Sequence, residues 1–272
     1  MRPKKTHRPR KRWGQNFLTD TVLAQKIVQS IQTAPPFLII EIGPGRGILT
    51  RYLLEHHQPY VGIEIDRQLV ADLRAAFGKS PHFQLMEGDV LTVDWQRIFQ
   101  QYKGYPPVVI GNIPYNITSP ILFKIFDHVP PIQEAIVMVQ KEVAQRLVAS
   151  VGNKAYGILS IMAAVYGEVS YLFTVPAGRF FPRPAVDSAV VRFQFPSPLR
   201  ETIRDMAGFK KIVRTAFQQR RKILKNSLIP LLPAGIVDKL KVNWRLRPEQ
   251  LDVNDWIALS NQVWTLMQQQ NL

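Results

Sequence analysis

The 272-residue sequence predicts an α/β protein with a doubly wound sheet, followed by a smaller all-helical domain. Short apolar runs alternate with helical stretches between residues 37 and 139, which indicates repeated β–loop–α units. Several of these runs are continuously apolar, as is typical of parallel strands covered on both faces. After residue 197 the strand pattern ends and helical periodicity remains.

The elements of the predicted sheet follow one another along the chain. Strands are predicted at Phe37–Ile42, Tyr60–Ile65, His82–Met86, Pro107–Ile110, Ile132–Val139, Glu168–Val175 and Ser188–Phe195. Helices are predicted at Ile48–His56, Gln68–Phe77, Trp95–Gln101, Pro120–His128 and Lys141–Ser150. Ser119 and Pro120 are predicted to be the N-cap and first residue of their helix. Two prolines in 195–199 predict a linker, so we expect a basic flexible arm (1–12), a cofactor-binding domain (13–197) and a helical domain (198–272).

Composition limits the classes of function. With 46% hydrophobic residues the chain is expected to form a globular core. It has no cysteine, which excludes disulfides, thiolate nucleophiles and cysteine zinc sites, and no metal site is predicted. No apolar run reaches the roughly 18–20 residues of a membrane span, and no apolar segment follows the basic N-terminus as it would in a secretory signal. We therefore expect a cytoplasmic protein with no membrane partner. A monomer is also expected, although composition does not determine the oligomeric state.

The net charge of +15 lies mainly in two regions. Residues 1–12 contribute +7, residues 179–247 contribute +12, and the rest of the chain carries −4. Two basic regions on a mildly acidic body are typical of a protein that binds a polyanion, although a solvated surface that only confers solubility is the alternative. One amphipathic helix is predicted from residue 209 to 225, unless it breaks near Arg220, which falls on the apolar side. The predicted RNA-binding residues on its cationic face are Lys210, Lys211, Arg214, Arg221, Lys222 and Lys225.

A glycine-rich turn after the first predicted strand indicates a cofactor site. Gly43, Gly45 and Gly47 allow a tight turn and close approach of a ligand to the backbone. Their spacing is G-x-G-x-G, because Ile48 stands where a dinucleotide fingerprint has its third glycine. Glu41 disfavours a pyrophosphate and suits a ligand with positive charge. S-adenosylmethionine, which has a sulfonium and an ammonium group, fits this pattern, although a purely structural glycine turn is the alternative.

Two carboxylates follow the next two predicted strands. Glu64 lies 21 residues after Gly43, where a carboxylate can accept hydrogen bonds from both ribose hydroxyls of an adenosyl ligand. Asp89 follows the third strand and is predicted to reach the adenine amino group. A helix cap or turn residue is the alternative role for Asp89.

The sequence Asn112-Ile-Pro-Tyr115 follows the fourth predicted strand and resembles the Asn-Pro-Pro-Tyr loop of enzymes that methylate exocyclic amino groups. An aryl amine is a poor nucleophile because its lone pair is delocalised into the ring. Acceptors for both N–H groups, the Asn112 side-chain oxygen and the Ile113 carbonyl, favour a pyramidal nitrogen. Pro114 is predicted to fix the backbone and Tyr115 to stack on the base. Phe180 is predicted to cover the other base face, with Phe181 as the core residue of the pair, and the reverse assignment is the alternative.

Several longer motifs resemble those of the ribosomal RNA adenine dimethyltransferases. They are Arg12-Trp-Gly-Gln-Asn16-Phe-Leu18, Glu41-Ile-Gly-Pro-Gly45, Ile63-Glu-Ile-Asp66, Asn112-Ile-Pro-Tyr115, Gln140-Lys-Glu-Val-Ala-Gln-Arg-Leu-Val148, Lys154-Ala-Tyr-Gly-Ile-Leu-Ser160 and Val186-Asp-Ser-Ala-Val190. The tail, with Phe217-Gln-Gln-Arg-Arg-Lys222 and Asn226-Ser-Leu228, is similar to the bacterial small-subunit enzyme. The resemblance runs from about residue 10 to residue 260. Small departures are Trp13, Ile113 and Arg183.

The resemblance implies a Rossmann-like S-adenosylmethionine-dependent methyltransferase domain with a helical RNA- or ribosome-binding domain. It implies dimethylation at N6 of two adjacent adenines in the 3′-terminal hairpin of 16S rRNA during assembly of the 30S subunit. By position, the cofactor residues it implies are Asn16, Leu18, Gly43, Glu64, Asp89 and Asn112. The alternatives are a large-subunit rRNA methyltransferase of the macrolide-resistance type, a DNA adenine methyltransferase, and a non-enzymatic assembly factor that binds RNA.

Overall fold

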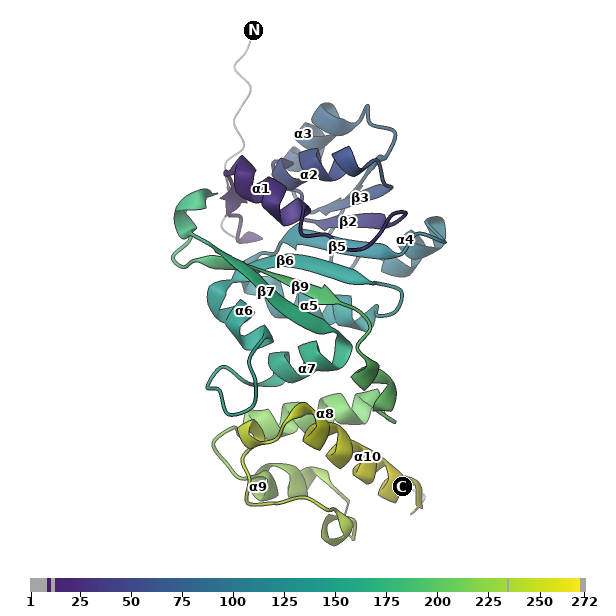
Figure 1. Ribbon diagram of the computed structural model, residues 1–272, viewed down its shortest axis with the longest axis vertical. Helices are drawn as coiled ribbons and strands as arrows, with labels where there is room; N and C mark the ends of the chain where they lie inside the picture. The colour runs from purple at the N-terminus through teal and green to yellow at the C-terminus, as the bar shows by residue number, and fades with distance from the viewer. Residues whose placement is uncertain (1–8, 11–12, 234, 270–272) are drawn as a thin grey trace. The chain divides into compact units, whose positions relative to one another are not determined.

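The computed structural model describes residues 9–10, 13–233 and 235–269, and the chain divides into two compact units (Figure 1). Unit 1 comprises Met1–Ala144 and Ser170–Phe195, and unit 2 comprises Gln145–Val169 and Pro196–Leu272. The division after residue 195 lies two residues from the boundary predicted after residue 197. Residues 145–169, which were expected in the first domain, group instead with the C-terminal helices. Unit 2 is therefore built from two separate stretches of chain.

A seven-stranded sheet in the order β4-β3-β2-β5-β6-β9-β7 forms the centre of the fold, and a two-stranded ribbon pairs β1 with β8. The strands are β1 (Phe17–Leu18), β2 (Leu38–Ile42), β3 (Tyr60–Glu64), β4 (Phe83–Glu87), β5 (Pro107–Asn112), β6 (Glu134–Gln140), β7 (Glu168–Val175), β8 (Phe180–Phe181) and β9 (Ser188–Gln194). Strands β4, β3, β2, β5 and β6 are parallel, whereas β9 runs antiparallel to β6. The predicted α/β class and the seven predicted strands are confirmed.

Helices cover both faces of the sheet, as Figure 1 shows, so its inner parallel strands β3, β2, β5 and β6 are mainly apolar, whereas the edge strand β4 is half-buried. Every residue of β2 and β3 is buried. Since all five parallel strands point the same way, the loops after β2, β3, β4 and β5 meet at one edge of the sheet, which is where doubly wound folds bind ligands.

The helices confirm most of the predicted positions, and the described residues contain three further α-helices that were not predicted: α1, α7 and α10. The α-helices are α1 (Thr21–Val28), α2 (Ile48–Leu53), α3 (Arg67–Phe77), α4 (Trp95–Gln101), α5 (Thr118–Asp127), α6 (Lys141–Leu147), α7 (Ile158–Tyr166), α8 (Met206–Gln218), α9 (Leu224–Leu228) and α10 (Val253–Gln269). Aspartates at N-cap positions begin four of them, because each carboxylate accepts a backbone N–H of the first turn. These N-caps are Asp20, Asp66, Asp94 and Asp205. None of the helices among the described residues combines the length and the apolar character that crossing a membrane requires.

One helix prediction is corrected, and the alternative stated for another is confirmed. Helix α5 begins at Thr118 rather than at Pro120, because a 3₁₀ turn at Tyr115–Ile117 runs directly into it and a proline is tolerated throughout the first turn. The break near Arg220, stated as the alternative to a single helix from 209 to 225, is confirmed: α8 ends at Gln218, and α9 begins at Leu224. Within unit 2, α8 packs against α7 and α10, and its residues Phe209 and Val213 are buried. The Phe217 ring of α8 lies 5.9 Å from that of Trp256 in α10.

Candidate functional site

A cavity of about 370 Å³ opens at the edge of the sheet where the parallel strands end. Its wall is formed by the loops after β2, β3, β4 and β5 and by Trp13–Leu18, which we call the strap. Of the predicted site residues, it contains Asn16, Leu18, Gly43, Gly45, Glu64, Asp89, Asn112, Ile113, Pro114 and Tyr115. The structure thus brings together residues spread over about a hundred positions of the chain.

The glycine turn forms one side of the cavity with a backbone that few other residues could adopt. Gly43 and Gly45 have φ angles of 63° and 59°, in the left-handed region. A Cβ at Gly43 would meet no atom of the described residues within 4 Å, so the backbone there is open to the cavity. A Cβ at Gly45 would lie 3.1 Å from the Phe17 ring of the strap. The turn therefore leaves room for a ligand on one side and for the strap on the other.

Glu64, at the end of β3, connects the glycine turn to the next loop. Its Oε2 accepts the Gly45 N–H at 3.0 Å, and its Oε1 accepts the Asp66 N–H at 2.9 Å. Burial raises the pKa of Glu64, and these backbone donors oppose the rise. Each carboxylate oxygen retains acceptor capacity beyond these bonds, as contact with a hydroxyl-bearing ligand requires.

A second buried carboxylate, Glu41, lies in the cavity wall at β2. Its Oε2 accepts hydrogen bonds from the Tyr60 hydroxyl at 2.6 Å and from the Thr50 hydroxyl at 2.7 Å. Burial, only partly opposed by these bonds, raises the pKa of Glu41 to about 7, and the nearby Glu64 charge adds to the rise. Two carboxylates in one largely buried wall favour a ligand that carries positive charge. The roles of Thr50 and Tyr60 were not predicted, because neither residue lies in a motif.

Asp89, after β4, has one carboxylate oxygen engaged in a turn. Its Oδ1 accepts the Leu91 N–H at 2.9 Å, so the alternative reading of this residue as a turn former describes part of its role. No hydrogen bond from a described residue reaches its Oδ2. Since Asp89 also lines the cavity, the turn and ligand-binding roles are compatible.

The amide of Asn112 is oriented by the strap. Its Nδ2 donates to the Asn16 carbonyl at 2.8 Å, and no described residue donates to its Oδ1. The Ile113 N–H donates to the Met138 carbonyl at 3.0 Å, which ties the loop to β6. The two acceptors that the sequence singled out, Asn112 Oδ1 and the Ile113 carbonyl, accept no hydrogen bond from the described residues. The Asn112 Oδ1 is therefore available to an external donor, whereas Ile113 lines the cavity but is fully buried.

Tyr115 lines the cavity at the start of a 3₁₀ turn, and its hydroxyl is hydrogen-bonded to the Ser188 Oγ at 2.5 Å. Ser188 is completely buried at the first position of β9, so this bond fixes the position of the ring. Burial raises the pKa of Tyr115. Ser188 was not predicted as a site residue, although it lies in the motif Val186-Asp-Ser-Ala-Val190.

The expected arrangement of Phe180 and Phe181 is wrong. Phe180 is only 5% exposed and belongs to the hydrophobic core together with Leu18 and Val190, whereas Phe181 is 54% exposed. The physical reason is the pairing of β8 with β1, in which Leu18 lies opposite Phe180 and turns that side chain inward. As placed here, Phe180 presents no face to the cavity.

The predicted RNA-binding cations lie in unit 2 on three short elements rather than on one helix. Lys210, Lys211 and Arg214 are on α8, Arg221 and Lys222 are in the turn after it, and Lys225 is on α9. All are exposed except Lys210, whose ammonium lies 5.5 Å from the centre of the Tyr166 ring. The basic flexible arm predicted at 1–12 lies outside the described residues except for residues 9 and 10.

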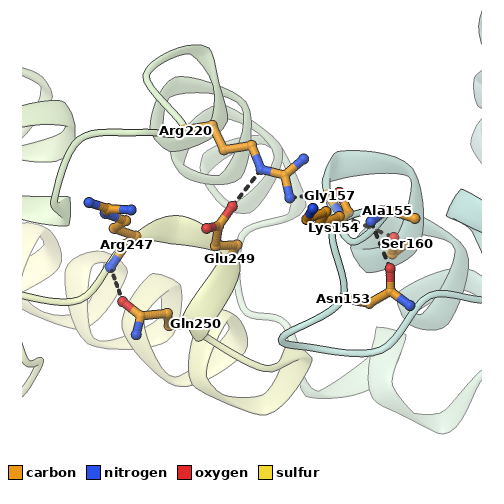
Figure 2. A network of polar contacts seen from close by, with 9 residues as sticks. All are labelled: Asn153, Lys154, Ala155, Gly157, Ser160, Arg220, Arg247, Glu249 and Gln250. Atoms are coloured by element: carbon orange, nitrogen blue, oxygen red, sulfur yellow. Dashed lines mark hydrogen bonds and ion pairs between the residues drawn. The ribbon is translucent and has the colours of Figure 1, made fainter.

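Arg220 follows the end of α8 and contacts two distant parts of the chain. Figure 2 shows its guanidinium turned towards Glu249 and Lys154: the Nε lies 2.6 Å from the Glu249 Oε2, and the Nη2 donates to the Lys154 carbonyl at 2.8 Å. The Gly152 N–H also donates to the Glu249 carbonyl. Arg220 therefore joins the two stretches of unit 2, whereas its neighbours Arg221 and Lys222 are exposed.

Comparisons with known proteins agree with this site. Residues 6–266 match the ribosomal RNA adenine dimethylase family. The sequence is 40% identical over 257 residues to the ribosomal RNA small subunit methyltransferase A of Pseudomonas aeruginosa, covering 94% of this chain and 95% of the relative. It is 42% identical over 256 residues to the protein of the same name from Bacteroides fragilis, covering 94% and 92%.

Solved structures show the same fold. A dimethyladenosine transferase from Plasmodium falciparum superposes with a TM-score of 0.75 at 23% identity, over 94% of this chain and 98% of that one. The 23S rRNA methyltransferase ErmE superposes with a TM-score of 0.67 at 25% identity, over 91% and 99%. The match over nearly the whole chain, and the assembly of the predicted motifs around one cavity, establish that this protein belongs to the ribosomal RNA adenine dimethylase family.

Proposed function

We propose that this protein transfers methyl groups from S-adenosylmethionine to N6 of two adjacent adenines in the 3′-terminal hairpin of 16S rRNA. The products are N6,N6-dimethyladenosines, and the partner is the immature 30S subunit in the cytoplasm, on which the protein acts as a monomer. The identity of 40–42% to small-subunit enzymes, against 25% to ErmE, favours this substrate over a large-subunit one.

The cavity fits the proposed cofactor. When bound, S-adenosylmethionine supplies an activated methyl group next to a positively charged sulfur. Glu41 and Glu64 place two buried carboxyl groups in the cavity wall, and a positively charged ligand would favour their ionised forms, which burial alone disfavours. The open backbone at Gly43 allows close approach. Glu64 would hold the ribose hydroxyls, Asp89 the adenine amino group, and Asn16, Leu18 and Gly45 the remaining contacts, which are proposed from their place in the wall.

The observation that carries the proposed chemistry is the orientation of the Asn112 amide. Because Nδ2 is bonded to the Asn16 carbonyl, Oδ1 is the atom left to accept an N–H of the target adenine. The Ile113 carbonyl would accept the second N–H, so the amine nitrogen becomes pyramidal and its lone pair is directed at the methyl group. Pro114 holds this loop extended, with φ −57° and ψ 131°. No strong general base is required, since the proton leaves after the nitrogen has attacked.

Stacking would hold the target base. Tyr115 presents an aromatic ring in the cavity wall, and its bond to Ser188 keeps that ring in one place. Stacking on an aromatic side chain contributes about 1–3 kcal/mol for each base, which offsets part of the cost of unstacking the adenine from the RNA. In unit 2 the exposed cations Lys211, Arg214, Arg221, Lys222 and Lys225, with Lys210, would bind rRNA phosphates.

The test supplies labelled S-adenosylmethionine and undermethylated small subunits, followed by digestion and identification of the nucleoside. We expect N6,N6-dimethyladenosine from the wild-type protein and a rate lower by ~10² or more for Asn112→Ala, the order seen when a transition-state hydrogen bond is lost. Subunit binding should change little, and cofactor saturation must be verified because Asn112 also contributes to the cavity. Undermethylated large subunits form the second arm. Methylation of the large subunit alone, or a normal rate for Asn112→Ala, would contradict the proposal.

A further inference from the structure

The strap, Trp13–Leu18, forms a wall of the cavity although it precedes the sheet in the chain. Its C-terminal end is fixed by the β1–β8 ribbon, in which Phe17 pairs with Phe181 and Leu18 with Phe180. Asn16 lies in the middle of the strap, and its carbonyl accepts the hydrogen bond from the Asn112 Nδ2. The geometry of Asn112 thus depends on where the strap lies, and so on what holds the other end of the strap.

That end is held by Gln15. Its Nε2 donates to the Asp66 Oδ2 at 3.2 Å, and its Oε1 accepts the Arg10 N–H at 2.7 Å. Gln15 therefore uses both ends of its amide: the Nε2 binds the N-cap of α3, and the Oε1 binds the backbone just before the strap. The Arg10 Nε lies 3.7 Å from the same Asp66 oxygen, which adds a weaker contact to the same anchor.

Asp66 is a firm anchor because it is completely buried and held on two further sides. Its Oδ1 accepts the Gln68 N–H at 3.0 Å as the N-cap of α3, and its own N–H donates to the Glu64 Oε1. The anchor of the strap is thus joined directly to the carboxylate proposed to hold the ribose.

We propose that Gln15 is a positioning residue for methyl transfer: it holds the strap on Asp66 and so keeps the Asn112 amide with Oδ1 free for the target amine. This inference rests on the proposed function. If the strap moved, the Asn16 carbonyl would no longer select one orientation of the amide, because a rotation by half a turn exchanges Oδ1 and Nδ2. The turned amide would offer N–H groups to an amine that needs acceptors.

Isosteric substitutions can exchange the donor and the acceptor of the hydrogen bond between Gln15 and Asp66. Gln15→Glu places a second carboxylate against Asp66, and Asp66→Asn replaces the acceptor of the Gln15 Nε2 with a second amide while retaining an oxygen for the Gln68 N–H. In the double variant the introduced amide at position 66 donates to the introduced carboxylate at position 15, which still accepts the Arg10 N–H. Gln25→Glu, an exposed position on α1, is the matched control for the change of charge.

The measurement is kcat for methylation of undermethylated small subunits, at saturating S-adenosylmethionine and normalised to the cofactor-binding sites titrated in each sample. We expect kcat to fall about 10-fold in each single variant and to return to within about threefold of wild type in the double variant, with unchanged kcat for Gln25→Glu. The Kd for subunits should not change. In an Asn112→Ala background, Gln15→Glu should have no further effect on the residual rate, which a merely structural role would not produce.

Equal kcat in all variants, absence of rescue in the double variant, or additive losses with Asn112→Ala would each overturn the inference while the wild-type activity stands. An inactive wild-type protein would instead overturn the proposed function, and the inference with it.

Discussion

Replacing Glu41 with glutamine tests how a buried carboxylate in the cavity wall affects stability. Both hydrogen bonds that Glu41 receives, from Thr50 and Tyr60, reach the same oxygen, Oε2. A glutamine oxygen can accept both, so Glu41→Gln should keep these contacts and the fold. What the substitution removes is the proton that the carboxyl can gain or lose.

The size of the effect follows from the pKa of Glu41, which burial raises from its ordinary value of 4.5 to about 7. At 1.36 kcal/mol for each pH unit, this rise corresponds to about 3 kcal/mol of stability. Because the folded protein holds the proton more tightly than the unfolded chain, the contribution is fully present below pH 4.5 and is lost as the pH rises through about 7. The glutamine variant lacks this dependence.

The assay is urea unfolding of both proteins at several pH values from about 4 to about 8. We expect the free energy of unfolding of wild type, relative to Glu41→Gln, to fall by about 3 kcal/mol across this range. The exposed Glu55→Gln variant, in the same unit, should follow wild type at each pH. Parallel curves for wild type and Glu41→Gln would refute the reasoning, since they would mean that Glu41 titrates equally in the folded and unfolded chains.

Glu64→Ala should weaken S-adenosylmethionine binding by about 1–3 kcal/mol through the lost hydrogen bonds to a charged acceptor; calorimetry measures this, and preferential binding of NAD would contradict the proposed cofactor. Reversing the charges of Lys211 and Arg214 should weaken subunit binding and flatten its dependence on salt, without changing cofactor affinity; an unchanged salt slope would mean that these residues are only a solvated surface. Phe180→Ala should cost about 3–5 kcal/mol in thermal unfolding because Phe180 is in the core, whereas Phe181→Ala should cost little. The opposite ranking would contradict their burial.

Most of the sheet and one edge of the site could be predicted from the sequence because local signals and tertiary packing agree there. The apolar runs of β2 and β3 are buried on both faces, so the apolar composition of each run correctly predicts a buried strand. Glu64, Asp89 and Asn112 come together because the ends of parallel strands meet at one edge, which follows from the fold class alone.

The rest depends on contacts between residues far apart in the chain. The orientation of Phe180 is set by Leu18, more than 160 positions earlier, and nothing local distinguishes Phe180 from Phe181. A helical wheel over 209–225 indicates a break near Arg220, but it cannot show that Arg220 meets Glu249 and Lys154, which are distant in the chain. The bond between Tyr115 and Ser188 is likewise invisible to periodicity.

Unit 2 is built from two separate stretches of the chain, which affects both the synthesis of the protein and the design of truncated forms. Helix α7, whose buried residues include Ile161, Met162 and Val165, is synthesised well before its partners α8 and α10. During translation the apolar face of α7 stays uncovered until β9 and then α8 and α10 have been synthesised. A stop codon after residue 195 would therefore release a protein with an exposed apolar helix that is prone to aggregate. Isolating unit 1 requires excision of residues 145–169 as well, with a linker that joins Ala144 to Ser170.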